Sequence, residues 1–356
     1  MNSFAIGVDL GGTNLRIAAV DSSGKVLDKI STDAEVTRGR DYVLDEMCKN
    51  VRALAAKFES RGRMVGIGIG VPGIIDRQTG LVHESPNLPG WHDYPARAEI
   101  ERRLHTRVIL ENDANAAALG EKWLGIASQF DDMCMVTLGT GVGGGLVLQG
   151  KIWHGMTGMA GELGHTTVDP NGVKCGCGNH GCLEQYASAT AVKRMAAEAI
   201  ARGEAPEMAR AMNRDPEFSA KGIYQMASQC DEAALNIFRS VGQALGIALA
   251  NMINVLNLPI YVIGGGMANA WDAFAPAMLD QIQKRSFVYA ATSHGDVVEI
   301  ARTNASNAQL RQSTIIAREL LGGDAGLLGA ARLPMIAAPV LSGSERKHAS
   351  AGIGER

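Results

Sequence analysis

The stretch Phe4-Ala-Ile-Gly-Val-Asp-Leu-Gly-Gly-Thr13 joins a short apolar run directly to a glycine turn. A second apolar run starts at Leu15, and Asp21-Ser-Ser-Gly24 turns into a third, so the pattern predicts a three-stranded meander. The first turn offers backbone N–H groups, the Thr13 hydroxyl and the Asp9 carboxylate. It is neither a Walker loop nor a dinucleotide fingerprint, because both of those open a helix. A plain hairpin and a phosphate-binding turn both fit these residues.

The same pattern returns near the middle of the chain. Thr137-Leu-Gly-Thr-Gly141 follows the apolar run that begins at Met133, and Gly150-Lys-Ile152 repeats the turn Gly24-Lys-Val26. Internal repetition of this kind predicts two homologous halves, each opening with a hairpin whose glycine turn can hold phosphate. We therefore expect an α/β protein whose halves face each other across a cleft.

Composition limits the class of protein. The 356 residues suffice for two domains, and 46% hydrophobic with 20% charged residues is typical of a globular protein. A net charge of -3 and an aromatic content of 5% argue against a nucleic-acid partner. The chain begins without a signal-peptide pattern, and no uninterrupted apolar run approaches the ~18 residues of a membrane span. We expect a cytoplasmic protein with no membrane partner.

Three cysteines and two histidines lie close together between residues 162 and 184. Cys175, Cys177 and Cys182 lie in a glycine-rich loop, and three thiolates plus one imidazole form a closed tetrahedral zinc site. His165 or His180 can supply the imidazole; His165 is favoured because Glu162-x-x-His165 would bring a carboxylate along with the metal. A disulfide or free thiols are the alternative.

A fully ligated zinc cannot activate water, so its role would be to hold the loop in shape. The loop would then direct Glu162, Glu184 and His165 toward another ligand. Carboxylates fixed in this way suit a ligand with many hydroxyl groups, because each one can accept two hydrogen bonds.

Another polar group follows the apolar run Val108-Ile-Leu110. Glu111-Asn-Asp113 comes at the predicted carboxyl end of that strand, and Ala114 to Glu121 continues as a helix. Ligands of parallel sheets bind at this end of a strand, and the start of a helix adds a positive dipole. A helix cap by Asn112 or Asp113 alone explains the same residues.

Periodicity supplies the remaining elements. It predicts helices over 41–60, 95–104, 188–202, 231–257 and 272–285, and strands over 64–71, 259–263 and 297–301. Glycines at alternate positions of 64–71 indicate that a helix or a ligand passes close to that strand. From Pro334 onward the chain is rich in Ala, Ser, Gly and charge, and we expect a disordered tail.

These motifs resemble those of the ROK family of sugar kinases and repressors, and its bacterial glucokinases in particular. The motifs that carry the resemblance are Asp9–Thr13 with Arg16, Glu111–Ala116, Leu138–Gly145, Glu162-x-x-His165 and Cys175–Glu184. The resemblance runs from about Ile6 to Leu333. It implies the actin-like ATPase (ribonuclease H-like) α/β fold, with two duplicated domains around a cleft. We place these domains at 1–120 and 121–333, followed by the tail 334–356.

The resemblance also implies a role for each site residue. Asp113 is the general base. The sugar contacts are Gly73, Asn87, Asn112, Asp113, Glu162, His165 and Glu184. The ATP contacts are Asp9, Gly11, Gly12, Thr13, Arg16, Gly139, Thr140, Gly141, Gly264 and Gly265, with Mg²⁺ bound to the phosphates and adenosine at Gly264 and Gly265. The zinc ligands are His165, Cys175, Cys177 and Cys182.

The expected reaction is transfer of the γ-phosphoryl group of ATP to O6 of an aldohexose, foremost D-glucose. The alternatives are a kinase for N-acetylmannosamine, N-acetylglucosamine, fructose or allose, and a sugar-responsive repressor. Repressors of the family carry an N-terminal helix-turn-helix, whereas here the phosphate strand begins at residue 4, so we expect an enzyme. The resemblance further implies a homodimer or homotetramer.

Overall fold

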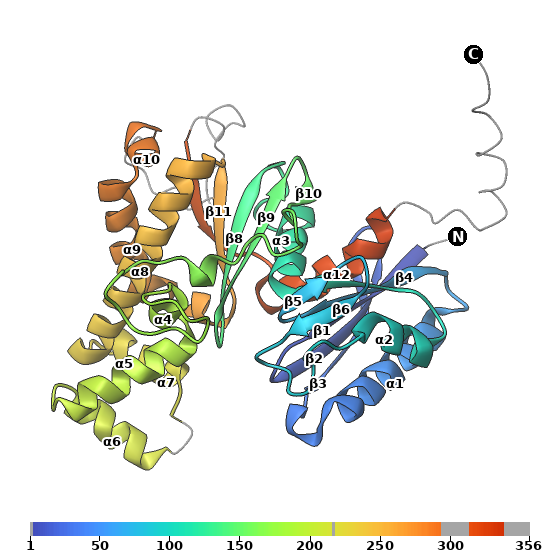
Figure 1. Ribbon diagram of the computed structural model, residues 1–356, viewed down its shortest axis with the longest axis horizontal. Coiled ribbons are helices and arrows are strands. Elements are labelled where there is room, and N and C mark those ends of the chain that lie inside the picture. Colours follow the sequence, from blue (N-terminus) through green and yellow to red (C-terminus); the bar gives the residue numbers. More distant parts are fainter. Residues whose placement is uncertain (1–2, 216–217, 293–312, 338–356) are drawn as a thin grey trace.

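The structure is a computed structural model that describes residues 3–215, 218–292 and 313–337. Two five-stranded sheets form the centres of two lobes (Figure 1). The first sheet has the order β3-β2-β1-β4-β7, with β1 (Ser3–Leu10), β2 (Asn14–Asp21), β3 (Val26–Asp33), β4 (Arg63–Val71) and β7 (Val108–Asn112). The second has the order β10-β9-β8-β11-β12, with β8 (Met133–Leu138), β9 (Val142–Leu148), β10 (Lys151–Ile152), β11 (Ile260–Gly264) and β12 (Ile315–Arg318). A small hairpin pairs β5 (Ile74–Asp76) with β6 (Leu81–Glu84).

The two sheets have the same plan, which confirms the duplicated α/β architecture. Each begins with an antiparallel meander, β1-β2-β3 or β8-β9-β10, and continues with two parallel strands. Asp9 pairs with Arg16 across the first hairpin, and Thr137 pairs with Gly143 across the second. Both glycine turns therefore lie at equivalent positions, at the carboxyl ends of β1 and β8.

Helices cover both sheets. In the first lobe these are α1 (Arg40–Phe58) and α2 (Ala96–Leu104), followed by α3 (Asp113–Trp123) between the sheets. The second lobe carries α4 (Glu184–Ala187), α5 (Ala189–Ala201), α6 (Pro206–Arg214), α7 (Ala220–Ser228), α8 (Glu232–Leu256), α9 (Trp271–Arg285) and α10 (Phe287–Thr292). The last helix of the described residues is α12 (Ala325–Ile336). Short 3₁₀ turns are η1 (Val36–Arg38), η2 (Leu163–His165), η3 (Gly266–Ala270) and η5 (Gly322–Asp324).

Alternation along β1 and β4 separates two faces of the first sheet. Ile6, Val8 and Leu10 point into the core that α1 covers. The opposite face carries glycines, and there α12 lies against the strands: a Cβ added at Gly7 would lie 2.4 Å from the carbonyl oxygen of Leu327, and one at Gly68 only 1.9 Å from that of Ala330. The element that passes close to the glycines of β4 is therefore a helix.

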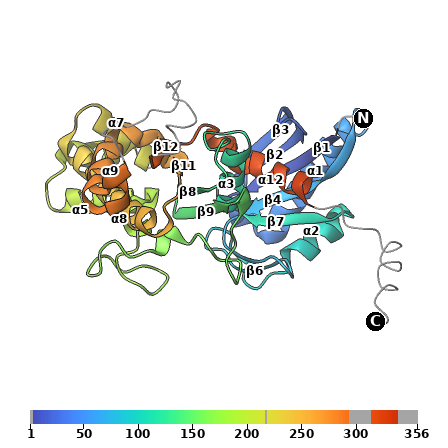
Figure 2. The same ribbon diagram turned by 90° about the horizontal axis from the view of Figure 1, so that it is seen from above.

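The position of α12 was not anticipated by the sequence. The sequence prediction placed residues 121–333 in the second domain, but α12 packs on β1, β4 and α3, beside the first sheet (Figure 2). It also continues to Ile336, beyond the expected start of the tail at Pro334. The rest of the tail and the predicted strand 297–301 lie outside the described residues.

Helix α3 touches both halves. It packs against β8 and β9 of the second sheet as well as against α12. Glycines again permit the contact: a Cβ at Gly143 would lie 2.9 Å from the Ala114 Cβ, and one at Gly120 would lie 2.1 Å from the carbonyl oxygen of Ala325. The first residues of α3 are thereby held where the two sheets approach each other.

Helix α8 is the central helix of the second lobe. The sequence predicts 231–257, and Asp231 indeed caps the helix by accepting a hydrogen bond from the Ala234 N–H at 2.9 Å. Against the expectation from uninterrupted apolar runs, α8 is long and apolar enough to cross a membrane by length and composition. Twelve of its residues are buried and it lies within the largest hydrophobic core of the described residues, so 61% of its apolar window is already buried inside the protein.

Gly68→Ala should destabilise the protein, because the new methyl group would push α12 away from β4. We expect the free energy of unfolding to fall by about 1–3 kcal/mol, measured as a lower Tm by calorimetry. Gly70→Ala on the same face is the matched control, since its Cβ first meets the Ala116 Cβ at an ordinary 3.4 Å. Equal losses in both variants would contradict this account of the α12 contact.

Candidate active site

A cleft between the sheets holds two adjoining cavities of about 1090 Å³ and 750 Å³. Five residues line both of them: Asp9, Arg16, Asp113, Thr137 and Gly265. The larger cavity brings together every residue predicted to contact the sugar and every residue of the two glycine turns, namely Gly73, Asn87, Asn112, Asp113, Glu162, His165, Glu184, Gly11, Gly12, Thr13, Gly139, Thr140 and Gly141. The smaller cavity extends along the ends of β11 and β12 and the start of α12.

Asn112 caps α3, Asp113 is the first residue of this helix, and both line the cleft. The Asn112 Oδ1 accepts hydrogen bonds from the N–H groups of Ala114 (2.9 Å) and Asn115 (3.1 Å), and its Nδ2 donates to the Gly73 carbonyl oxygen at 3.2 Å. Asn112 can therefore cap the helix and line a ligand site at the same time. Capping fixes the Asn112 side chain, and the next residue, Asp113, projects into both cavities.

Two carboxyl groups share the centre of the cleft. Burial, and after it the neighbouring charge of Asp9, raise the pKa of Asp113 to about 6, against the opposing effect of the N–H groups at the start of α3. Burial also raises the pKa of Asp9, although the Arg16 guanidinium 3.5 Å away opposes that shift. At neutral pH Asp113 is an ionised carboxylate that can accept a proton readily, as a general base must.

The glycine turns are held by side chains from elsewhere. Glu184 Oε2 accepts a hydrogen bond from the Val142 N–H at 2.9 Å, directly after the turn Gly139–Gly141. Gly12 lies against Asn87, and Arg16 donates to the Gly323 carbonyl oxygen just before α12. Each turn thus has a fixed shape, with backbone N–H groups beside the cleft.

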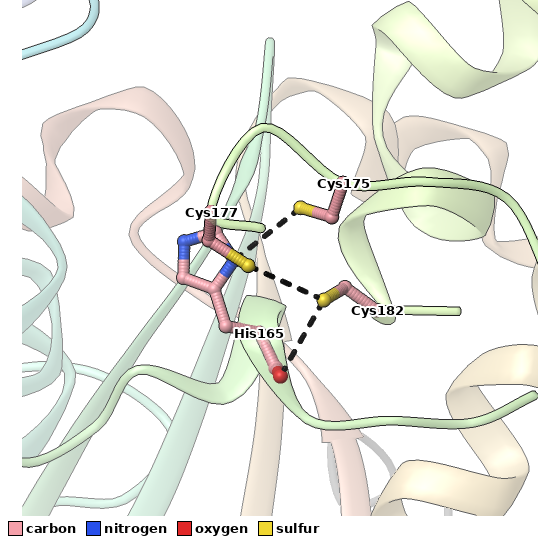
Figure 3. A group of neighbouring side chains, drawn as sticks. All are labelled: His165, Cys175, Cys177 and Cys182. Atoms are coloured by element: carbon pink, nitrogen blue, oxygen red, sulfur yellow. Dashed lines mark hydrogen bonds between the residues drawn. The ribbon is translucent and has the colours of Figure 1, made fainter. Parts of the chain in front are cut away.

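The predicted zinc ligands converge. One ligand atom from each of His165, Cys175, Cys177 and Cys182 lies within 4.8 Å of all the others (Figure 3), and the six cysteines of the chain are free thiols. Cys177 Sγ is 3.7 Å from Cys182 Sγ, close to the ~3.8 Å between two sulfur ligands of a tetrahedral ion with Zn–S bonds of ~2.3 Å. His180 is not in the cluster. The donor set and its spacing fit zinc, and no two of the three cysteines are joined by a disulfide.

The His165 ring faces two ways. Its Nδ1 lies 3.7 Å from Cys175 Sγ, whereas its Nε2 lies 4.0 Å from Glu162 Oε2 at the wall of the larger cavity. One imidazole can therefore bind an ion through Nδ1 and contact a ligand in the cavity through Nε2. Gly181 permits the tight fold of this loop, since its φ is +66° and a Cβ there would lie 1.6 Å from the Asp169 carbonyl oxygen.

The smaller cavity differs in part from the prediction. Gly265 lines it as expected, but Gly264 lines neither cavity. The Glu319 carboxylate and Met135 pack against Gly264 so closely that a Cβ at this position would collide with them. Glu319 itself lines the cavity, accepts a hydrogen bond from the Gly265 N–H at 2.9 Å, and has its pKa raised by burial to about 7.

Sequence reasoning missed several residues of the site. Glu319 follows β12 at its carboxyl end, the position where ligands of parallel sheets bind, so recognising that strand would have indicated it. Trp271 and Asn269 also line the smaller cavity, and Glu111 and Arg77 line the larger one. No local pattern marks Trp271, Asn269 or Arg77 as part of a site.

Comparison with known proteins agrees with this arrangement. A model of the ROK family matches residues 5–334. The chain belongs to the ROK family. Glucokinase of Thermotoga maritima is 38% identical to this ROK protein over 322 residues, which cover 89% of this chain and 98% of the relative. Glucokinase of Halalkalibacterium halodurans is 36% identical over 326 residues, covering 91% and 92%.

A solved structure gives the same picture. The crystal structure of a ROK family glucokinase from Streptomyces griseus, in complex with glucose and AMPPNP, matches this ROK protein with a TM-score of 0.74 at 30% identity. The match covers 93% of this chain and 98% of the other. The expected fold is thus confirmed as that of the family.

The raised pKa of Asp113 predicts a pH-dependent gain in stability from Asp113→Asn. In the unfolded chain an Asp pKa is near 3.9, so the energetic cost of ionising Asp113 in the folded state is absent below that pH and complete above about 6. Asp113→Asn removes this cost and should stabilise the protein by about 1–2 kcal/mol more near pH 8 than near pH 5. Thermal unfolding at both values measures it, with Glu59→Gln as control for an exposed carboxylate. The same gain at both pH values would contradict the raised pKa.

Proposed function

We propose that this protein transfers the γ-phosphoryl group of ATP to O6 of an aldohexose, with D-glucose as the preferred sugar. The observation that carries the proposal is the position of Asp113, which lines both cavities at their junction. One side of that junction has the hydrogen-bonding groups of a sugar site, and the two glycine turns lie beside it. The glucokinases of Thermotoga maritima and Halalkalibacterium halodurans, similar over nearly the whole chain, support glucose as the acceptor.

Asp113 acts as the general base. A primary alcohol hardly ionises at pH 7, so its proton must leave as the bond to phosphorus forms, and a well-placed base contributes about 10²- to 10⁴-fold. With a pKa of about 6, Asp113 is ionised at neutral pH and still basic enough to take that proton. Asn112, Glu162, His165 and Glu184 orient the ring hydroxyl groups so that O6 faces the phosphate.

The phosphates lie between the turns Gly11–Thr13 and Gly139–Gly141, whose residues all line the larger cavity and include the hydroxyl groups of Thr13 and Thr140. Mg²⁺ bound to ATP offsets the charge that gathers during phosphoryl transfer. Asp9 would hold it through water, and Arg16 keeps Asp9 in place. The adenosine part occupies the smaller cavity, along Gly265 and Gly266.

Zinc is the structural cofactor of this proposal. His165, Cys175, Cys177 and Cys182 would hold it, and four protein ligands would make its role structural, with no part in phosphoryl transfer. It fixes His165 next to Glu162 and the segment that leads to Glu184. A homodimeric or homotetrameric assembly and a cytoplasmic location belong to the same proposal.

The alternative to glucose is another hexose as the phosphoryl acceptor. A kinase for N-acetylmannosamine, N-acetylglucosamine, fructose or allose would use the same base and phosphate turns. A sugar-responsive regulator would need the sugar site without the base, so Asp113 and both turns favour an enzyme. Initial rates with a panel of hexoses and MgATP, with the 6-phosphate product identified by mass spectrometry, test the choice; no turnover of glucose would reject the proposal.

Asp113→Asn should lower kcat at least about 100-fold while glucose still binds, because the amide keeps the shape of the carboxyl group but cannot accept the proton. Steady-state kinetics and calorimetric titration with glucose measure the two effects. Glu162→Gln is the matched control and should raise the KM for glucose more than it lowers kcat. Near-normal turnover by Asp113→Asn would rule out its role as the base.

Cys175→Ser should release zinc and disorder the loop that bears Glu162 and Glu184. We expect the KM for glucose to rise at least about tenfold, because contacts to the sugar are lost. Metal analysis and kinetics check both effects, with Cys230→Ser as control since Cys230 is an exposed thiol outside the cluster. A zinc-free variant that binds glucose normally would contradict the scaffold role.

A further inference from the structure

Glu111 is a buried carboxylate next to the proposed site that has no role in the proposed reaction. Its side chain is 2% exposed. The Oε1 accepts hydrogen bonds from the Asn112 N–H at 3.0 Å and from Asn115 Nδ2 at 3.1 Å. The Oε2 lies 2.8 Å from His154 Nε2. The carboxylate thus joins the first turn of α3 to a residue that follows β10 of the other sheet.

The hydrogen bonds assign the tautomer of His154. Its Nδ1 lies 3.0 Å from Arg77 Nη1, and a guanidinium can only donate hydrogen bonds. The Nδ1 must therefore accept, so the ring proton is on Nε2 and is donated to Glu111. Arg77 Nε also lies 3.6 Å from Glu111 Oε2, which balances the buried charge. Three side chains from three segments form one connected unit.

His154 opens the loop that leads to Glu162. Its carbonyl oxygen accepts a hydrogen bond from the Ala160 N–H at 3.2 Å, which closes the loop on itself. The other end of the loop rests on the second sheet, since a Cβ at Gly161 would lie 2.6 Å from the Gly144 carbonyl oxygen. Residues 158–162 line the larger cavity between these two anchors.

We propose that His154 is a positioning residue for sugar binding: it pins the Glu162-bearing loop to Glu111, and so sets Glu162 of one half relative to Asn112 and Asp113 of the other. This inference rests on the proposed function. The zinc cluster fixes the loop on the far side of Glu162, and His154 fixes it on the near side. The Glu162 side chain is half exposed and accepts no capping hydrogen bond in η2, so its position depends on these two anchors.

Replacement of His154 should affect sugar and not ATP. His154→Ala removes the donor to Glu111 while the glycine turns keep their own contacts. We expect the KM for glucose to rise about tenfold, with a smaller fall in kcat and an unchanged KM for ATP. Zinc content should stay that of the wild type, because no zinc ligand contacts His154. A similar rise in both KM values would indicate general damage and overturn the proposal.

His154→Gln tests the hydrogen bond itself. The glutamine Nε2 reaches nearly as far as the imidazole Nε2 and can donate to Glu111, so this variant should recover most of the glucose affinity. His154→Asn is too short to reach Glu111 and should behave like the alanine variant; it also decides the question if the alanine variant does not fold. Met156→Ala is the control, since Met156 lies in the same loop with 98% of its surface exposed.

Activity of the wild-type protein toward hexoses distinguishes failure of this inference from failure of the proposed function. If it fails to phosphorylate any hexose, the function is wrong, whatever the variants do. If it phosphorylates glucose and both His154→Ala and His154→Asn show the wild-type KM for glucose, the positioning role is wrong and the function stands. Calorimetric titration of glucose into each variant, without ATP, repeats the comparison as binding alone and needs no turnover.

Discussion

Close contact between backbones is the constraint on which this structure depends. Helices α3 and α12 lie so near the strands and each other that side chains larger than hydrogen cannot be accommodated at Gly7, Gly68, Gly120 or Gly143 without displacement. This packing brings the first turn of α3 to the meeting point of both sheets. The geometry of the cleft is therefore set by the backbone of the scaffold, and the short side chain of Asp113 is long enough to reach both cavities.

The same proximity determines the electrostatics. Asp9 lies one residue before the end of β1 and Asp113 begins α3, and with α12 packed beside them the two carboxyl groups occupy one partly buried space. The start of α3 favours an anion at Asp113, but loss of water and the charge of Asp9 outweigh it, and the pKa rises to about 6. The carboxylate of Glu111 adds a buried negative charge next to Asn112. The Arg77 guanidinium balances it, and His154 donates a hydrogen bond to it, so the group of three adds no net charge.

Local motifs made much of this site predictable. The glycine turns follow their strands, the cysteines lie close in sequence, and Asn112-Asp113 stands at a strand end, so short-range rules identified all three and the duplication related the two turns. Contacts between distant segments were not predictable in this way. The return of α12 to the first sheet joins residues about 300 positions apart, and His154 meets Glu111 only because two halves are assembled. Gly264 was misjudged because a glycine that admits Glu319 looks the same in sequence as one that admits a ligand.

The return of α12 has a bearing on biosynthesis. A ribosome makes β1 and β4 first, yet the helix that covers their glycine face is translated only after the whole second lobe. Until then the early half of the nascent polypeptide lacks one of its layers and cannot reach its final stability, so its completion waits for the far end of the chain. Active centre and early lobe thus mature together, in the last stage of synthesis.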